Sequence, residues 1–198
     1  MRKVIVYIAT SADGFIARLD GDVGWLERPR VAGDYAMDQF YRSIDTVLMG
    51  RKTYEFALKV GQTSYPGKRN CIFSRTPRTS HIPEVEFVSE DAGEFVKRLR
   101  MGPGKAIWLC GGGELIASLL DAGQVDEFII HVIPILIGEG IQLLQPRHRT
   151  VPLALVSARS YPDGVVRLHY RVERRTGAVI ASEIVRGKRR TRRGTPDD

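Results

Sequence analysis

The most informative stretch for predicting the fold is Ala106-Ile107-Trp108-Leu109-Cys110-Gly111-Gly112-Gly113-Glu114. Its five apolar residues predict a buried strand, and the three glycines predict a tight turn. Residues 114–120 follow with a helical pattern, and Gly123 closes that helix. A strand that passes through glycines directly into a helix is a typical unit of a parallel α/β sheet.

The same stretch carries the strongest local sign of a binding site. Glycines at the end of a strand let the backbone approach a ligand closely, and the next helix offers free N–H groups to a phosphate. It is not a Rossmann fingerprint, because Ile116 stands where the third glycine of that motif belongs. A plain strand-to-helix turn is the alternative interpretation.

Similar units precede this stretch and a hairpin follows it. Strands are expected at residues 4–9, 45–49, 71–73, 85–88, 106–110 and 128–134, and helices at 34–44, 52–58, after a Ser89 cap, and at 114–120. Residues 151–160 and 165–172 are two further strands around a Tyr-Pro-Asp-Gly turn. We therefore predict an α/β fold with a mixed, mostly parallel sheet, helices on both faces and a C-terminal antiparallel hairpin.

Composition supports one globular domain and excludes several classes. The chain has 198 residues, of which 43% are hydrophobic and 27% charged. Its apolar runs are much shorter than a membrane span, and residues 1–8 suit a first strand better than a signal peptide. Cys71 and Cys110 are too few for a disulfide framework or a zinc site, and the four histidines lack metal spacing. We expect a cytoplasmic protein without a metal.

The net charge of +7 is concentrated at the C-terminus. Residues 174–198 hold eight basic and three acidic residues, whereas residues 1–173 hold 22 basic and 20 acidic ones. We predict a domain over residues 1–173 and a basic extension over 174–198, with one short strand and disorder from Gly187 onward. Residues 188–193 suggest weak, non-specific contact with nucleic acid.

Two other strand ends carry groups that suit a phosphate. Gly50, Arg51, Lys52 and Thr53 begin a helix, where two cations oppose the helix dipole unless they bind an anion. Ser74 and Arg75 follow the next strand, and a hydroxyl with a guanidinium can receive a phosphate monoester. A solvated surface pair is the alternative for Arg51 and Lys52. Open α/β sheets bind ligands where the carboxyl ends of their strands meet.

Three passages, in this order, resemble the dihydrofolate reductase superfamily. They are residues 9–17, 48–55 and 111–115. The sequence Asp-Gly-Phe-Ile-Ala within the first passage is most similar to the reductase domain of the riboflavin-biosynthesis deaminase/reductase and its stand-alone relatives. Residues 119–127 and 132–140 share that similarity, and the resemblance extends over about residues 2–173.

This resemblance implies a reductase that uses NADPH. It places Ala9 and Ile16 beside the nicotinamide. The other implied contacts are Gly50, Arg51, Lys52 and Thr53 to the pyrophosphate and adenosine phosphate, Ser74 and Arg75 to the 2′-phosphate, and Gly111, Gly112, Gly113, Glu114 and Leu115 to the pyrophosphate and nicotinamide side. The positive charges agree with a preference for NADP over NAD.

The substrate side departs from the superfamily. Dihydrofolate reductase carries a carboxylate in its first helix, and Asp34 and Asp38 are the candidates here, although neither aligns firmly. Their alternative role is to form an acidic first turn exposed to solvent. We place Trp25, Tyr41 and Cys110 on the substrate side as well. Residues 17–29 would form a lid, with Trp25 either anchoring this loop or covering the ligand.

These observations favour a reductase that transfers hydride from NADPH to a small heterocyclic or ribityl-type C=N or C=O substrate. Two alternatives remain open, namely a cofactor-binding protein without catalysis and a nucleic-acid-associated protein that uses the basic extension. The apolar residues 128–137 suit a homodimer interface as well as a core.

Overall fold

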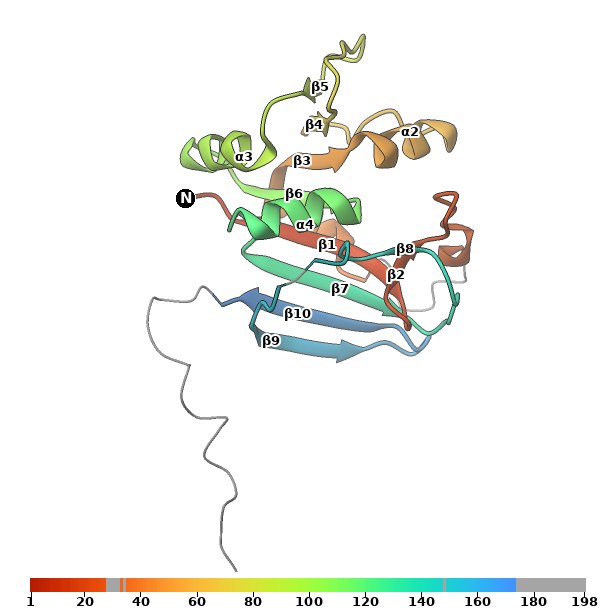
Figure 1. The fold of residues 1–198 in the computed structure, drawn as a ribbon. Helices are drawn as coiled ribbons and strands as arrows, with labels where there is room; N and C mark the ends of the chain where they lie inside the picture. Colours follow the sequence, from red (N-terminus) through yellow and green to blue (C-terminus); the bar gives the residue numbers. More distant parts are fainter. Residues whose placement is uncertain (28–32, 34, 148, 174–198) are drawn as a thin grey trace, which may run out of the picture.

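The computed structural model describes residues 1–27, 33, 35–147 and 149–173, and an eight-stranded sheet forms its centre (Figure 1). The strands are β1 (Val4–Ser11), β2 (Phe15–Ala17), β3 (Ile44–Gly50), β4 (Arg69–Phe73), β5 (Val85–Val88), β6 (Ala106–Gly111), β7 (Glu127–Ile133), β8 (Ile141–Gln142), β9 (Leu153–Ser160) and β10 (Val166–Val172). The helices are η1 (Gly24–Leu26), α1 (Met37–Ser43), α2 (Arg51–Lys59), α3 (Ala92–Met101) and α4 (Gly113–Asp121). Asp34 and the expected strand and disorder after residue 173 lie outside the described residues.

The expected mixed sheet is confirmed. Its order is β5-β4-β3-β6-β1-β7-β10-β9, and the strands from β5 to β7 are parallel. β10 pairs antiparallel with β7 and with β9, so the C-terminal hairpin forms one end of the sheet. β2 and β8 form a separate two-stranded sheet. β1 therefore lies near the middle, with the strand–helix units on one side of it and the hairpin on the other.

Two apolar clusters hold helices against opposite faces of the sheet. Alternate residues of β1 belong to different clusters, with Val4 and Val6 facing one side and Ile5 the other. The first cluster includes residues of α3 and α4, and the second includes Phe40 of α1 and Tyr54 of α2. Phe128 and Ile129 of β7 are buried in these clusters, so much of the apolar segment 128–137 serves the core.

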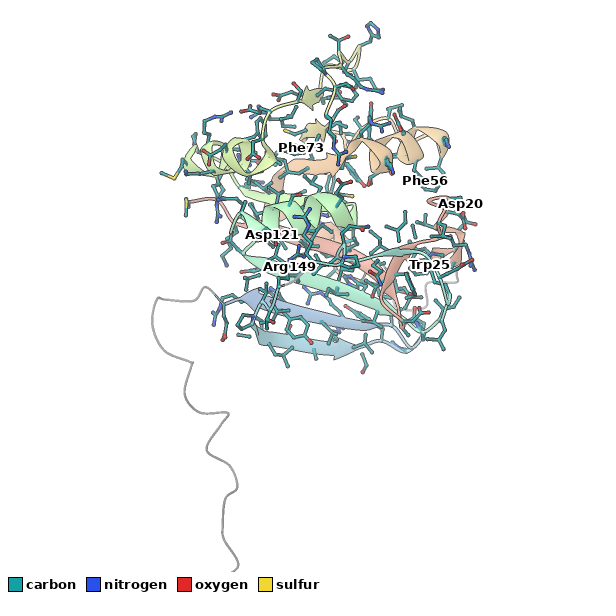
Figure 2. All side chains as sticks on the ribbon, viewed as in Figure 1. Asp20, Trp25, Phe56, Phe73, Asp121 and Arg149 are labelled. Atoms are coloured by element: carbon teal, nitrogen blue, oxygen red, sulfur yellow. The ribbon has the colours of Figure 1, made fainter. Side chains whose placement is uncertain are left out.

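Two arginines that follow β8 in the sequence contact one carboxylate at the end of α4. The side chain of Asp121 forms ion pairs with Arg147 and Arg149, and Arg149 Nε lies 2.7 Å from Asp121 Oδ1 (Figure 2). Leu143, Leu144 and Val151 pack on the cluster beneath α4.

Two helix starts differ from expectation. The predicted helix 34–44 begins only at Met37, because Tyr35 and Ala36 have φ angles of 53° and 67°, outside the helical region. Ser89 is not the cap of α3. Asp91 takes this role, and its carboxylate accepts a hydrogen bond of 2.9 Å from the Glu94 amide.

Helix α2 extends further than the predicted 52–58. It starts at Arg51 directly after β3, and so it includes the first of the two candidate cations. Within the part of the chain that the structure describes, no helix has the length and hydrophobicity needed to cross a membrane.

Candidate active site

The carboxyl ends of β3, β4 and β6 meet at one edge of the sheet. In the strand register, Gly50 pairs with Phe73, and Met49 pairs with Gly111. The residues that follow these strands are the three sets predicted from the sequence, namely 50–53, 74–75 and 111–115. The fold therefore brings the predicted cofactor-binding residues of these strands to one place, which we call the phosphate edge.

The starts of α2 and α4 lie side by side at the phosphate edge. A Cβ atom added to Gly50 would lie 3.8 Å from the Gly112 nitrogen. Gly50 and Gly112 are the N-caps of the two helices, and neither helix has a hydrogen bond from a capping side chain. Their first N–H groups and the positive ends of both dipoles are thus available to an anion.

A different structural feature accounts for glycine at each of the positions 111, 112 and 113. Gly111 has a φ of 137°, a conformation that other residues rarely adopt, and its peptide bond to Gly112 is cis. A Cβ on Gly112 would lie 3.2 Å from the Thr53 hydroxyl, so Thr53 stands beside the turn. A Cβ on Gly113 would overlap the Gln142 carbonyl oxygen of β8. Gly113 is therefore required by packing, independently of any ligand.

Arg51 is already paired within α2. Its Nη1 atom donates to both carboxylate oxygens of Glu55, at 2.7 and 2.8 Å. The hydrogen bond from Arg51 lowers the pKa of Glu55. Arg78 also lies 3.6 Å from Glu55, whereas Lys52 is exposed. Sequence reasoning missed Arg78, because it follows Pro77 in a loop whose direction no local pattern indicates.

Ser74 and Arg75 differ in their exposure to solvent. Ser74 is buried, and its hydroxyl donates 2.8 Å to the Thr76 carbonyl oxygen, so it stabilises the turn after β4. The Arg75 side chain is 90% exposed and forms an ion pair with Glu114 in the first turn of α4. Arg75 is therefore free to turn toward a ligand at modest cost, because an exposed ion pair contributes little.

Burial differs among three of the expected cofactor contacts, Leu115, Ile16 and Ala9. The side chain of Leu115 is buried in the core beneath α4, so only its backbone is available at the phosphate edge. Ile16 is half-buried in β2. Ala9, near the end of β1, packs against an apolar cluster with Ile133 and Tyr161.

The loop between β2 and η1 reaches α2. A Cβ on Gly21 would lie 3.6 Å from a ring carbon of Phe56, and Figure 2 shows Asp20 close to Phe56. Trp25 packs on the same cluster as Ala9 and so anchors this loop, but its Nε1 atom is buried without a hydrogen-bond partner. This part of the chain thus contacts α2 through Gly21 and the cluster around Ala9 through Trp25, and its role as a lid stays a prediction.

Asp38 and Tyr41 make contacts on α1 and with the loop before β4. The side chain of Asp38 is 78% exposed and lies 3.9 Å from Arg42, so it suits the solvent-exposed first turn that was the alternative. The Tyr41 hydroxyl donates 2.8 Å to the Pro66 carbonyl oxygen, and the Lys68 ammonium lies 4.3 Å from its ring centre. The substrate-side role of these two residues remains a prediction.

Cys110 lies beside the aromatic cluster of the α1 face. Its Sγ atom is 3.6 Å from the Tyr65 hydroxyl, and burial raises the pKa of the thiol to about 11. A thiol with this pKa stays protonated at neutral pH and is a weak nucleophile. Cys110 is thus suited to packing, and its place on the substrate side stays a prediction.

His131 is a buried neighbour of Ala9 that the sequence did not reveal. It pairs in register with Ala9, is only 5% exposed, and its ring centre lies 4.8 Å from that of Tyr7. Burial and the nearby Arg167 lower its pKa to about 4, so the imidazole is neutral at physiological pH. Ala9 and His131 are neighbours only because β1 pairs with β7, and no residue spacing in the sequence indicates that pairing.

Comparison with known proteins finds a matching family, a similar sequence and similar structures. The RibD C-terminal domain family matches residues 2–167. The chain is 37% identical over 171 residues to the uncharacterized protein YwjB of Bacillus subtilis strain 168, covering 85% of this chain and 97% of YwjB. A putative riboflavin biosynthesis protein from Shewanella sp. PV-4 has a similar structure, with a TM-score of 0.77, 25% identity, and coverage of 87% of this chain and 99% of that one.

A second solved structure shares the fold at lower identity. It is a diaminohydroxyphosphoribosylaminopyrimidine deaminase/5-amino-6-(5-phosphoribosylamino)uracil reductase from Thermotoga maritima. The TM-score is 0.64 at 16% identity, and the match covers 86% of this chain and 56% of the larger protein.

Proposed function

Because the chain belongs to the RibD C-terminal domain family, we propose that it is a reductase that uses NADPH to reduce a small C=N or C=O substrate. The observation that carries the cofactor assignment is the phosphate edge. Two helix N-termini without side-chain caps lie side by side there, and Arg51, Lys52, Arg75 and Arg78 surround them.

The residues present fit a dinucleotide with an additional phosphate. The N–H groups at the starts of α2 and α4 suit a pyrophosphate, and the bare backbone of Gly50 and Gly112 leaves room for its close approach. The exposed guanidinium of Arg75 suits the 2′-phosphate that distinguishes NADPH from NADH. Ser74 supports this contact by holding the turn that presents Arg75.

The reducing end of the cofactor belongs near Ala9. Bound NADPH would supply the hydride, and the protein orients the two reactants and excludes water. Ala9 has a small side chain near the end of β1, and Ile16 is a half-buried apolar residue of β2, a strand that contacts β1. The loop that carries Gly21 and Trp25 contacts both α2 and the cluster around Ala9, so it can shield the reacting atoms.

Titration with NADPH and with NADH tests this proposal. We expect NADPH to bind at micromolar concentration, and Arg75→Ala to weaken NADPH by about tenfold or more while NADH changes by about twofold or less. Arg98→Ala is the matched control, because Arg98 is an exposed, ion-paired arginine on α3.

Two results would contradict the proposal. The first is no binding of either nucleotide at high micromolar concentration, and the second is an equal loss for both nucleotides in Arg75→Ala. Turnover is then measured on a panel of reducible heterocycles. Binding without turnover across the whole panel would favour a cofactor-binding protein without catalysis.

A further inference from the structure

Residues 134–143 lie against two parts of the proposed cofactor site. β8, near the end of this segment, pairs antiparallel with β2, so that Phe15 stands opposite Gln142. A Cβ atom on Gly113 would overlap the Gln142 carbonyl oxygen, so β8 also touches the start of α4. The 134–143 segment therefore contacts both the strand that carries Ile16 and the phosphate edge.

One carboxylate holds the turn between β1 and β2 against this segment. Asp13 Oδ2 accepts hydrogen bonds from the amides of Ile137 and Gly138, at 3.1 and 2.8 Å. A hydrogen bond from the Ser11 side chain, followed by those from the two amides, lowers the pKa of Asp13, so the carboxylate is ionised at neutral pH. Hydrogen bonds to an ionised acceptor are roughly twice as strong as those between neutral groups. Asp13 is therefore a strong contact between two segments that lie far apart in the sequence.

Backbone contacts place the turn and the 134–143 segment close together on both sides of Asp13. Before it, the Ala12 amide donates 2.8 Å to the Ile135 carbonyl oxygen. After it, a Cβ atom on Gly140 would overlap the Ala17 carbonyl oxygen, so the segment and β2 meet there without room for a side chain. The turn and the segment thus form one unit, and Asp13 is its ionised side-chain contact.

The short strands β2 and β8 give this turn only weak support. β2 has three residues and β8 has two, and they form a sheet of their own. An isolated pair of strands is marginally stable in water. Asp13 and Gly138 are exposed, so water can replace the hydrogen bond between them. The Asp13 carboxylate is thus not needed to satisfy buried groups, and what it adds is a fixed position for the turn.

We propose that Asp13 is a positioning residue, which holds the β1–β2 turn on the 134–143 segment and so fixes Ile16 beside the nicotinamide. This inference rests on the proposed function, which places the nicotinamide near Ala9 and Ile16. Ile16 follows Asp13 by three residues, so a displaced turn moves it as well. The starts of α2 and α4 follow directly after β3 and β6 of the main sheet. The contacts to the phosphates of the cofactor should therefore be independent of Asp13.

Titration of the full chain with two nucleotides tests this role. The first is NADPH, and the second is 2′-phospho-ADP-ribose, which has the same phosphates but no nicotinamide. Asp13→Asn keeps the shape of the side chain and removes its charge. We expect this variant to weaken NADPH about fivefold or more, and 2′-phospho-ADP-ribose by about twofold or less. A role in general stability would weaken both nucleotides alike.

Asp91→Asn is the matched control. Asp91 is also exposed, and its carboxylate accepts a hydrogen bond of 2.9 Å from the Glu94 amide, but it lies at the start of α3. Asparagine caps helices about as well as aspartate does. The control should therefore fold normally and bind both nucleotides within about twofold of the wild type.

Hydrogen–deuterium exchange in the nucleotide-free protein measures the order of the turn directly. Asp13→Asn should raise the exchange rate about fivefold or more at the amides of residues 15–17 and 137–138, and leave that of β7 unchanged. Unchanged exchange in the turn, unchanged NADPH affinity, or an equal loss for both nucleotides would each overturn the proposal. If the wild type binds neither nucleotide, the proposed function is wrong, and the exchange rates alone decide whether Asp13 positions the turn.

Discussion

Arg51 and Glu55 form an ion pair along the first turn of α2, in which one guanidinium nitrogen donates to both carboxylate oxygens at 2.7 and 2.8 Å. This pair lies at the phosphate edge, beside the start of α4. Glu55 therefore competes with any phosphate for Arg51, and for Arg78, which lies 3.6 Å from the same carboxylate. Glu55 thereby holds the side chains of Arg51 and Arg78 at the edge where we propose that the phosphates bind.

Glu55→Gln should raise the affinity for NADPH about three- to tenfold, because it removes a competing negative charge and releases both arginines. Fluorescence titration measures this change. Glu90→Gln is the control, since Glu90 pairs with Arg98 away from the phosphate edge and its loss should leave the affinity unchanged. A lower affinity in Glu55→Gln would mean that Glu55 is needed to position Arg51.

The phosphate edge could be predicted because each part of the evidence for it lies within one short stretch of sequence. Each predicted set is a strand followed directly by glycine, hydroxyl or basic residues, and parallel strands bring their carboxyl ends together. Gly111 to Gly113, Gly50 to Thr53, and Ser74 with Arg75 all come to this edge. Local evidence also has limits. The 3.6-residue period turns the Leu115 side chain into the core, so its expected contact with the ligand stays a prediction for the backbone alone.

The surroundings of Ala9 could not be predicted, because non-local pairing builds them. His131 and Arg167 belong to an antiparallel pair, and His131 meets Ala9 only through the parallel pairing of β1 with β7. The start of α1 was also misplaced. The pattern of Met37 and Phe40 located the helix, but nothing in the sequence showed that Tyr35 and Ala36 adopt positive φ.

The buried imidazole of His131 should make the protein less stable in acid. Its pKa is about 4 in the folded chain against an ordinary value of 6.5, so the unfolded chain binds more protons between these two values. Stability therefore rises with pH from 4 to 6.5 and is lost as the pH falls. Between pH 7 and pH 4 the wild type should lose roughly 3 kcal/mol more than His131→Gln.

Urea unfolding at several pH values measures this difference. His81→Gln, which alters an exposed histidine, should keep the acid sensitivity of the wild type. Identical pH profiles for the wild type and His131→Gln would show that His131 keeps its ordinary pKa in the folded protein.

The β9–β10 end of the sheet suits a second copy of the chain. Leu155 of β9 pairs with Tyr170, and Tyr170 pairs with the buried Phe128, so all three face the same side. Figure 1 shows α3 and α4 over the middle strands, with β9 and β10 beyond them. Leu153 and Leu155 are 41% and 60% exposed on a strand that forms the edge of the sheet. Such an apolar edge, which no strand of the described residues covers, favours association, and we propose a homodimer through this face.

Leu155→Asp should convert this dimer to a monomer, because it would bury a carboxylate in the interface. Light scattering after size-exclusion chromatography measures the mass in solution. Ser157→Asp is the matched control on the opposite face of the same strand, where it pairs with His169, and it should leave the dimer intact. A monomeric wild type would contradict the proposal directly.

Gly113 and Gly50 should respond to alanine in different ways, although both stand at helix starts of the phosphate edge. A methyl group on Gly113 would overlap the Gln142 carbonyl oxygen and lie 3.1 Å from that of Leu143, so the backbone of β8 must move. Gly113→Ala should therefore lower the free energy of unfolding by about 1–3 kcal/mol. A methyl group on Gly50 meets only ordinary contacts at 3.8 and 3.9 Å, and its φ of −74° suits alanine.

Gly50→Ala should consequently change the stability by less than about 0.5 kcal/mol. Its methyl group would instead occupy space beside Gly112, where the pyrophosphate is proposed to approach the backbone, and the affinity for NADPH should fall by about tenfold. Chemical denaturation and nucleotide titration of the two variants separate these effects. Normal NADPH affinity in Gly50→Ala would place the pyrophosphate away from the junction of α2 and α4, whereas unchanged stability in Gly113→Ala would show that β8 moves aside readily.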